Sequence, residues 1–247
     1  MGTRLAAVAS LVPPGSVVAD IGTDHAYLPV YLVTEGGCPR AVAVEKSARN
    51  ARKAQETVLH YNAGHKVDVR IGDGLLALSE KDGVDTIVIA GIGGITICEI
   101  LEAAGQRLRR YAHIILQPMG NLPQVRRWLF DSDFSFENEK LALEKGHYYE
   151  IIAAVQKKDD GCEINAGSEG IKKESYKEAL YLELGPCLLR GDDPLLIPWL
   201  TEKIKYYEGI LKELSRSGQN KGKAKASYIS DRCHLMKDVL ENVHNRG

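Results

Sequence analysis

The 247-residue chain is long enough for one domain and an appendage, and its 44% apolar and 26% charged residues are typical of a chain with a sizeable core. A formal charge of −1, from 32 basic and 33 acidic residues, excludes the uniformly basic profile of histone-like proteins, so any contact with nucleic acid must come from local patches. The five cysteines are scattered and form no CxxC pair. This argues against a disulfide framework and against a zinc site, and it fits a reducing cytoplasm.

The chain begins with an apolar run, from Leu5 to Val12, that follows the single basic residue Arg4. Such a run can resemble a short signal peptide, but one positive charge is weak and the small-residue triplet at 7–9 falls inside the run instead of after it. No stretch approaches 18 uninterrupted apolar residues, so we expect no membrane segment and a cytoplasmic protein.

From residue 16 to 156, short β-branched runs alternate with longer helical stretches. The intervals between runs have the length of a crossover helix, which predicts a parallel sheet with helices on both faces. The predicted strands are 17–21, 41–45, 67–71, 86–90 and 113–117. The predicted helices between them are 26–34, 47–60, 94–108 and 122–130, with Ser47 as the N-cap of the second.

After Gln117 the rhythm changes. Segments 134–143 and 148–155 are separated only by a four-residue turn, so they are predicted to pair antiparallel at the sheet edge. Residues 156–168 are typical of a polar linker, and helical segments follow at 174–184, 194–217 and about 223–243, with a break at 218–220. The last two helices are predicted to form an antiparallel hairpin. The sequence thus predicts a doubly wound, Rossmann-like α/β domain with an antiparallel edge hairpin over residues 1–158, and an α-helical domain over 159–247.

In a doubly wound sheet, ligands bind at the carboxyl ends of the strands. The first strand end carries Asp20 and Gly22, but Asp24 stands where a dinucleotide-binding loop needs its second glycine, and a pyrophosphate would meet a like charge there. Glu45 and Asp73 close the second and third strands, where they can accept from ribose hydroxyls and from the amine of an adenine ring. Each acid singly could be a helix cap. Together they favour S-adenosylmethionine, a sulfonium with a neutral adenosine, over NAD.

A second glycine-rich turn, Gly91 to Gly94, follows the fourth strand, with Thr96 where the third glycine of a dinucleotide fingerprint belongs. It is either a tight structural turn or a backbone wall that lets a flat base approach the methyl donor. His25, beside Asp24, is either structural or part of the site. The seven histidines have no metal-ligand spacing, so we expect no metal.

Basic residues that could meet RNA phosphates gather after the fourth helix, in the fifth helix and around the break between the last two helices. Isolated charge runs are usually solvated surface, but the small residues between the last set leave its lysines room for phosphates. The candidates for RNA contact are Arg126, Arg127, Lys221, Lys223 and Lys225.

These motifs resemble the bacterial tRNA (adenine-22, N1)-methyltransferase family. The matching stretches include DIGTDHAYLP, VAVEKS, GDGL, IVIAGIGG, ILQPMGNLPQVRRWL, KGHYYEII and LGPCLL, which occur in order over nearly the whole chain. The resemblance implies a class I methyltransferase domain followed by a helical-hairpin domain, S-adenosylmethionine as the cofactor, and tRNA as the partner. It leaves the oligomeric state open, with a monomer slightly favoured.

The resemblance also implies roles for single residues. Those expected to hold S-adenosylmethionine are Asp20, Gly22, His25, Glu45, Lys46, Asp73, Gly74, Ala90 and Gly91. Those expected to face the target adenine are Asp24, Gly91, Gln117 and Pro118. The chain departs from the family at Met119, where the family usually has Asn, and carries Asn121 two residues later.

The implied reaction is methyl transfer to N1 of adenine 22 of tRNA. Adenine N1 has a lone pair and no proton, so in-line positioning and tolerance of the cation formed on the ring should supply most of the catalysis. Because N1 of a paired adenine is inaccessible, the base must be flipped or the RNA distorted. Two alternatives stay open: a tRNA-binding protein without catalysis, and an NAD-dependent oxidoreductase.

Overall fold

The computed structural model describes residues 1–157, 176–216 and 223–244, and the side chains of residues 176, 177, 216, 223–225 and 244 are not described. The chain divides into two compact units, Met1–Ser168 and Glu169–Gly247. The predicted boundary at residues 158 and 159, most of the predicted linker and the predicted break at 218–220 all lie outside the described residues.

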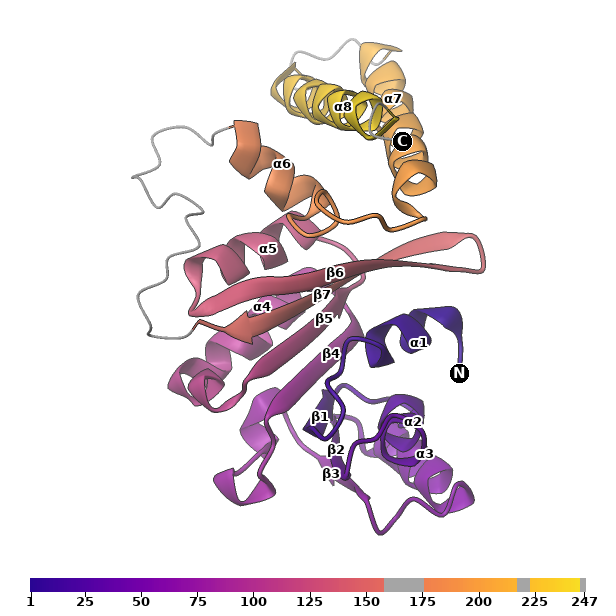
Figure 1. Cartoon of the computed structure of the whole chain (residues 1–247), viewed down its shortest axis with the longest axis vertical. Helices are drawn as coiled ribbons and strands as arrows, with labels where there is room; N and C mark the ends of the chain where they lie inside the picture. Colours follow the sequence, from indigo (N-terminus) through magenta and orange to yellow (C-terminus); the bar gives the residue numbers. More distant parts are fainter. Residues whose placement is uncertain (158–175, 217–222, 245–247) are drawn as a thin grey trace. The chain divides into compact units, whose positions relative to one another are not determined.

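The first unit is built on a seven-stranded sheet of order β3-β2-β1-β4-β5-β7-β6 (Figure 1). The strands are β1 (Val17–Ile21), β2 (Arg40–Glu45), β3 (Val67–Ile71), β4 (Thr86–Ile92), β5 (His113–Pro118), β6 (Phe134–Glu144) and β7 (His147–Gln156). β1 to β5 pair in parallel, with Ile21 opposite both Val44 of β2 and Ile89 of β4. The predicted strands, and hence the doubly wound, Rossmann-like α/β class, are confirmed.

Helices cover both faces of the sheet, as the alternating pattern predicted. The helices are α1 (Thr3–Ala9), α2 (Tyr27–Thr34), α3 (Ala48–His60), α4 (Gly94–Ala104) and α5 (Leu122–Asp131), with short 3-10 turns at Gly74–Ala77, Glu80–Asp82 and Gly105–Arg110. α1, α2 and α3 lie on one face and α4 and α5 on the other (Figure 1). Apolar side chains of the strands point alternately to the two faces of the sheet and belong to two separate buried clusters, one under each helical layer.

The N-terminal apolar run forms part of the fold. Val8 and Val12 are buried with the α1–α3 layer, and α1 lies over the sheet near the edge hairpin. Burial of both valines accounts for the run by packing, each buried Val contributing roughly 1.5–3 kcal/mol.

The edge hairpin is confirmed. β7 pairs antiparallel with β5, and β6 pairs antiparallel with β7 along its length, with Leu141 opposite Glu150. A register shift between Phe136 and Asn138 bends the outer strand. Because β7 runs against β5, its first residues lie at the carboxyl end of β5, where the site is expected.

The second unit consists of α6 (Tyr176–Leu184), α7 (Leu196–Arg216) and α8 (Lys223–His244). α7 and α8 pack along each other through buried residues such as Leu200, Ile204 and Met236, and Lys237 pairs with Glu208 at 2.6 Å. The predicted helical region is confirmed. No helix among the described residues combines the length and apolar character needed to cross a bilayer.

Candidate active site

The carboxyl ends of the parallel strands meet at one edge of the sheet. β1 lies in the centre, with β2 and β3 on one side and β4 and β5 on the other, so the order of the strands reverses next to β1. Open α/β sheets bind ligands at such a switch point. The loops that follow these five strands therefore form the candidate site.

The first loop begins at a buried carboxylate. Asp20 is 5% exposed, and the Thr23 hydroxyl donates a 2.6 Å hydrogen bond to it. Burial raises the pKa of Asp20 to about 6, against the opposing effects of that hydrogen bond and of the Arg4 charge. Gly22 has a φ of +79°, and a Cβ there would lie 2.7 Å from the Ile92 side chain. The positive φ and the close approach to Ile92 at the end of β4 together favour glycine at this position.

The same loop holds two non-glycine residues in the left-handed region. Asp24 has a φ of +43° and Ala26 a φ of +54°. Strain of this kind costs on the order of 1–3 kcal/mol and gathers at functional sites. The Asp24 side chain is exposed, 3.5 Å from Nε2 of His25, whose ring stacks on Tyr27. The loop therefore holds a carboxylate outward at the switch point.

Glu45 joins the loops after β1 and β2. Its Oε2 accepts from the Asp24 N–H at 3.4 Å, and its Oε1 accepts from the Ser47 N–H at 2.8 Å. Ser47 caps α3 by accepting from the Asn50 N–H, as predicted, so Glu45 does not cap that helix. Each carboxylate oxygen of Glu45 keeps a further acceptor site. The residue is thus held in place with acceptors left for a ligand.

A hollow of about 270 Å³ opens beside the end of β3. Asp73 lies at this hollow and pairs with Lys46 at 2.9 Å, both side chains being exposed. The lining of the hollow includes Lys46, Asp73, Gly74, Leu75, Thr96 and Ile100. Apolar side chains next to charged ones suit a flat ring that carries an amine.

The glycine-rich turn after β4 is fastened to the end of β5. The Met119 N–H donates to the Ile92 carbonyl at 2.8 Å, and the Gly94 N–H donates to the Gly120 carbonyl at 3.2 Å. A Cβ at Gly94 would overlap that carbonyl oxygen, so the close approach requires glycine. Gly91, with a φ of +77°, is exposed and presents bare backbone.

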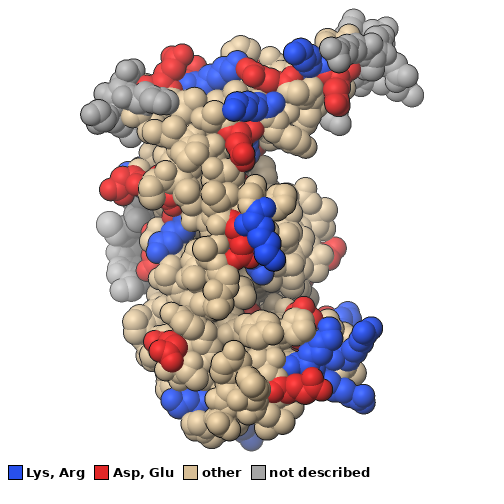
Figure 2. Space-filling model, turned by 90° about the vertical axis from the view of Figure 1, so that its right-hand side faces the viewer, with Lys and Arg blue, Asp and Glu red and all other residues tan. Residues whose placement is uncertain are grey.

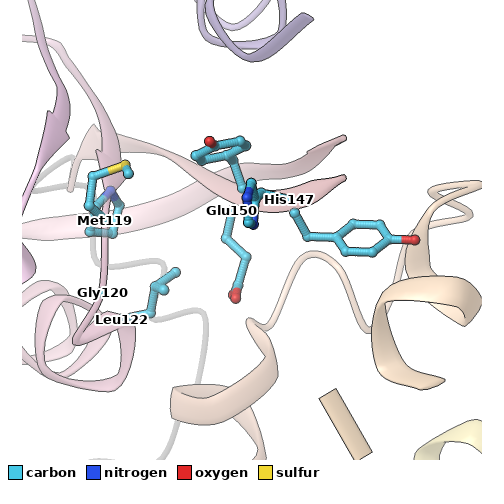
Figure 3. Close-up of a pocket in the computed structure, with 8 residues that line it drawn as sticks. Met119, Gly120, Leu122, His147 and Glu150 are labelled. Carbon is cyan, nitrogen blue, oxygen red and sulfur yellow. The ribbon is translucent and has the colours of Figure 1, made fainter. Parts of the chain in front are cut away.

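A second hollow, of about 410 Å³, lies at the ends of β5 and β7. Pro118, Met119 and Leu122 line it from one side, and His147, Tyr149 and Glu150 from the other. Figure 3 shows Met119 and Leu122 facing the Glu150 side chain across this space. Rings, a thioether and a carboxylate are a suitable lining for a nucleobase. The two hollows thus lie at the β3 side and the β5 side of the same sheet edge.

Gln117 does not line either hollow. Its side chain is fully buried, its Oε1 accepts from Arg4 Nη1 at 2.6 Å, and its Nε2 donates to the Pro118 carbonyl at 3.1 Å. The expectation that Gln117 faces the adenine is therefore corrected, because both ends of its amide are bonded within the protein. Sequence reasoning missed Arg4, since its partner lies 113 positions away and no local pattern links them.

Of the five residues predicted to contact RNA, the structure describes the side chains of two, Arg126 and Arg127. Arg126 is fully buried, with Nε 2.9 Å from Glu139 and Nη2 2.9 Å from Glu150, so the prediction that it contacts RNA is wrong. Its neighbour Arg127 is half-buried. Lys221 and the side chains of Lys223 and Lys225 lie outside the described residues. On the face drawn in Figure 2, the basic and acidic side chains of the described residues lie close to one another.

Comparison with known proteins decides the family. A family model described as a methyltransferase domain matches residues 1–152. The tRNA (adenine(22)-N(1))-methyltransferase of Bacillus subtilis is 31% identical over 243 residues, which cover 98% of both chains. The chain belongs to this methyltransferase family. The resemblance seen in the sequence motifs is thereby confirmed.

Solved structures of the family agree with the fold. The M1A22 tRNA methyltransferase of B. subtilis matches with a TM-score of 0.80 at 30% identity, covering 97% of this chain and 98% of the other. A Streptococcus pneumoniae structure in complex with S-adenosyl-L-methionine matches with a TM-score of 0.79 at 29% identity, covering 97% and 99%. Both units of this chain therefore have counterparts in the methyltransferase family. Within the described residues, no group of three or more His, Cys, Asp or Glu is placed to hold a metal ion.

Proposed function

We propose that the chain transfers a methyl group from S-adenosylmethionine to N1 of adenine 22 in tRNA. The observation that carries this is the sheet edge itself: two hollows of 270 and 410 Å³ lie on either side of a bare glycine turn and an outward carboxylate. One hollow suits the cofactor's adenosine and the other a substrate base. The full-length match to a tRNA (adenine(22)-N(1))-methyltransferase supports the choice of substrate.

The residues present fit the cofactor. Glu45, fixed by two backbone N–H groups, has acceptors left for the ribose hydroxyls, and Asp73 lies at the hollow that suits the adenine ring. Gly22 and Gly74, both with positive φ, bring backbone close to the ligand, while Asp20 supports the first loop from beneath. A dinucleotide is not favoured, because its pyrophosphate would meet the Asp24 carboxylate.

For methyl transfer, the protein must position the adenine against the methyl group and stabilise the positive charge that develops on the ring. When bound, S-adenosylmethionine supplies a methyl group on a positively charged sulfur, and transfer moves that charge to the adenine ring. The exposed carboxylate of Asp24 can accept from the N6 amine and stabilise the charge that develops on the ring. The bare backbone at Gly91 lets the ring approach closely. No proton has to leave N1, so the site needs no general base for the transfer.

In this proposal, both units of the chain contact the tRNA. We propose that residues 1–158 hold the cofactor and the target base, and that residues 159–247 grip the folded tRNA, with Lys221, Lys223 and Lys225 next to phosphates. The lysine spacing in the sequence supports this. A tRNA substrate also implies that the protein acts in the cytoplasm.

The decisive experiment uses labelled S-adenosylmethionine and an unmodified tRNA, beside the same tRNA with guanine at position 22. We expect label on the first RNA only. Label on both would keep the methyltransferase and discard the position. No label on either, with tRNA still bound, would favour the non-catalytic alternative.

A second prediction tests the cofactor site. Glu45→Gln should weaken S-adenosylmethionine binding by roughly 10- to 100-fold, because hydrogen bonds to a charged acceptor contribute about 1.5–3 kcal/mol. Calorimetry with the ligand and the full chain measures this directly. Glu56→Gln is the matched control, since Glu56 is exposed on α3, outside the candidate site. Unchanged affinity in Glu45→Gln would overturn the ribose assignment.

A further inference from the structure

One arginine at the start of the chain connects three strands of the candidate site. Arg4 Nη1 donates to Gln117 of β5 at 2.6 Å, and the guanidinium lies over the Tyr149 ring of β7, 5.6 Å from its centroid. The same nitrogen is 3.4 Å from where a Cβ of Gly91 would be, at the end of β4. Arg4 thus lies beside the glycine turn, bonds to the strand next to the second hollow, and stacks on one aromatic side chain of the lining of that hollow.

Arg4 is itself held in place by the edge hairpin. Its backbone N–H donates to Glu144 at 3.1 Å, and the preceding Thr3 hydroxyl donates to the Leu143 carbonyl at 2.8 Å. The hydrogen bond from the Arg4 N–H is the main reason why the pKa of Glu144 lies below its usual range. The buried Val8 anchors the rest of α1 against the sheet. The side chain therefore projects from a helix that is fixed at both ends.

The hydrogen bond to Gln117 determines how that amide is oriented. With Oε1 accepting from Arg4, the Nε2 group points to the Pro118 carbonyl at 3.1 Å and to the Met119 sulfur at 3.6 Å. Gln117 is fully buried, so a lost partner would leave an unsatisfied polar group next to the segment that receives the glycine turn. Met119 and Gly120 in this segment also bond to the turn.

We infer that Arg4 is a positioning residue for methyl transfer: by bonding to Gln117 and stacking on Tyr149, it fixes the segment 117–120 and the second hollow in the geometry that receives the target base. This inference rests on the proposed function. It assigns no contact between Arg4 and substrate. Misplacing a reacting group by about 1 Å can cost 100-fold in rate, so a residue that fixes the acceptor side should act on kcat and leave cofactor affinity alone.

The test is a double-mutant cycle with Arg4→Met and Gln117→Met, measured by methyl transfer to unmodified tRNA. Arg4→Met should lower kcat roughly 10- to 100-fold, with the Kd of S-adenosylmethionine changed less than about threefold. If Arg4 acts through Gln117, the double variant should be no slower than the slower single variant. Arg52→Met, on the exposed side of α3, which packs against β2 and β3 instead of the segment 117–120, should change neither quantity.

A second readout does not depend on activity. Amide hydrogen exchange at Met119 and Gly94, whose N–H groups join the turn to the end of β5, should be faster in Arg4→Met than in the parent, at unchanged exchange in β1 and β2. Unchanged exchange, or single-variant effects that multiply in the double variant, would overturn the inference. So would a raised KM for tRNA with normal kcat and a flatter salt dependence, which would make Arg4 a phosphate contact. If the parent transfers no methyl group, the proposed function fails while the exchange result still stands.

Discussion

Asp24→Asn should lower kcat for methyl transfer by on the order of 100-fold while the Kd for S-adenosylmethionine stays within about threefold. The side chain keeps its shape and can still accept from an N6 amine, but it no longer offers a negative charge to a ring that becomes positive. Asparagine is the correct replacement because the residue has a φ of +43°, and Asn tolerates the left-handed region far better than Ala.

Single-turnover transfer at saturating cofactor and tRNA separates this effect from binding, and calorimetry supplies the cofactor affinity. Asp131→Asn is the matched control: the same chemical change on an exposed residue at the C-terminal end of α5, which runs back from the site toward the opposite edge of the sheet. A normal kcat in Asp24→Asn would remove the residue from the mechanism. A large loss of cofactor affinity would move it into the cofactor site.

The sheet and the cofactor side of the site could be predicted because their signals are local. Each parallel strand is a short β-branched run, and parallel strands end at one edge, so acids that follow successive runs must converge there. The structure brings Glu45 within hydrogen-bond distance of the Asp24 N–H and places Asp73 at a hollow on the same edge. The fold class and the neighbourhood of these acids were both within reach of pattern reasoning.

The acceptor side was harder because its contacts are long-range. Arg4 meets Gln117 and Tyr149 only after the whole sheet has formed, and no spacing in the sequence links α1 to β5 or β7. Exposure of Gln117 could not be predicted either, since a strand-end amide can face ligand or core. In the structure its amide is buried and bonded to Arg4.

The helix pattern of α5 did contain a signal that Arg126 is buried, but the usual exposure of charged residues outweighed it in the prediction. Residues three and four apart share a helix face, so Arg126 lies on the same side of α5 as Leu122 and Leu129. The general rule that charged residues are exposed favoured the surface instead. The helix pattern could not reveal that Glu139 of β6 and Glu150 of β7 lie against Arg126, where their carboxylates neutralise the guanidinium.

Arg126→Met should destabilise the protein by about 3–5 kcal/mol, the usual cost of removing one partner from a buried ion cluster. Burial opposes the charged guanidinium, but the attraction of Glu139 and Glu150 outweighs it and keeps the pKa of Arg126 above its usual value. Methionine would fill much of the volume and remove the guanidinium that both carboxylates contact. The free energy of unfolding of the full chain, from urea titration of the transition that reports on the sheet, measures the loss.

Arg126→Met also tests whether Arg126 holds α5 against the edge hairpin or contacts RNA. Arg109→Met, which breaks an exposed ion pair with Asp133, should cost no more than about 1 kcal/mol and is the matched control. If Arg126→Met is as stable as that control, the cluster does not fasten α5 to the hairpin. Replacing all three charged residues with apolar ones should recover much of the stability, because no carboxylate then remains buried at the place where the Arg126 guanidinium was. Since Glu150 also lines the second hollow, that triple variant should fold yet bind the substrate base poorly, which would show that the cluster shapes the site as well as supporting it.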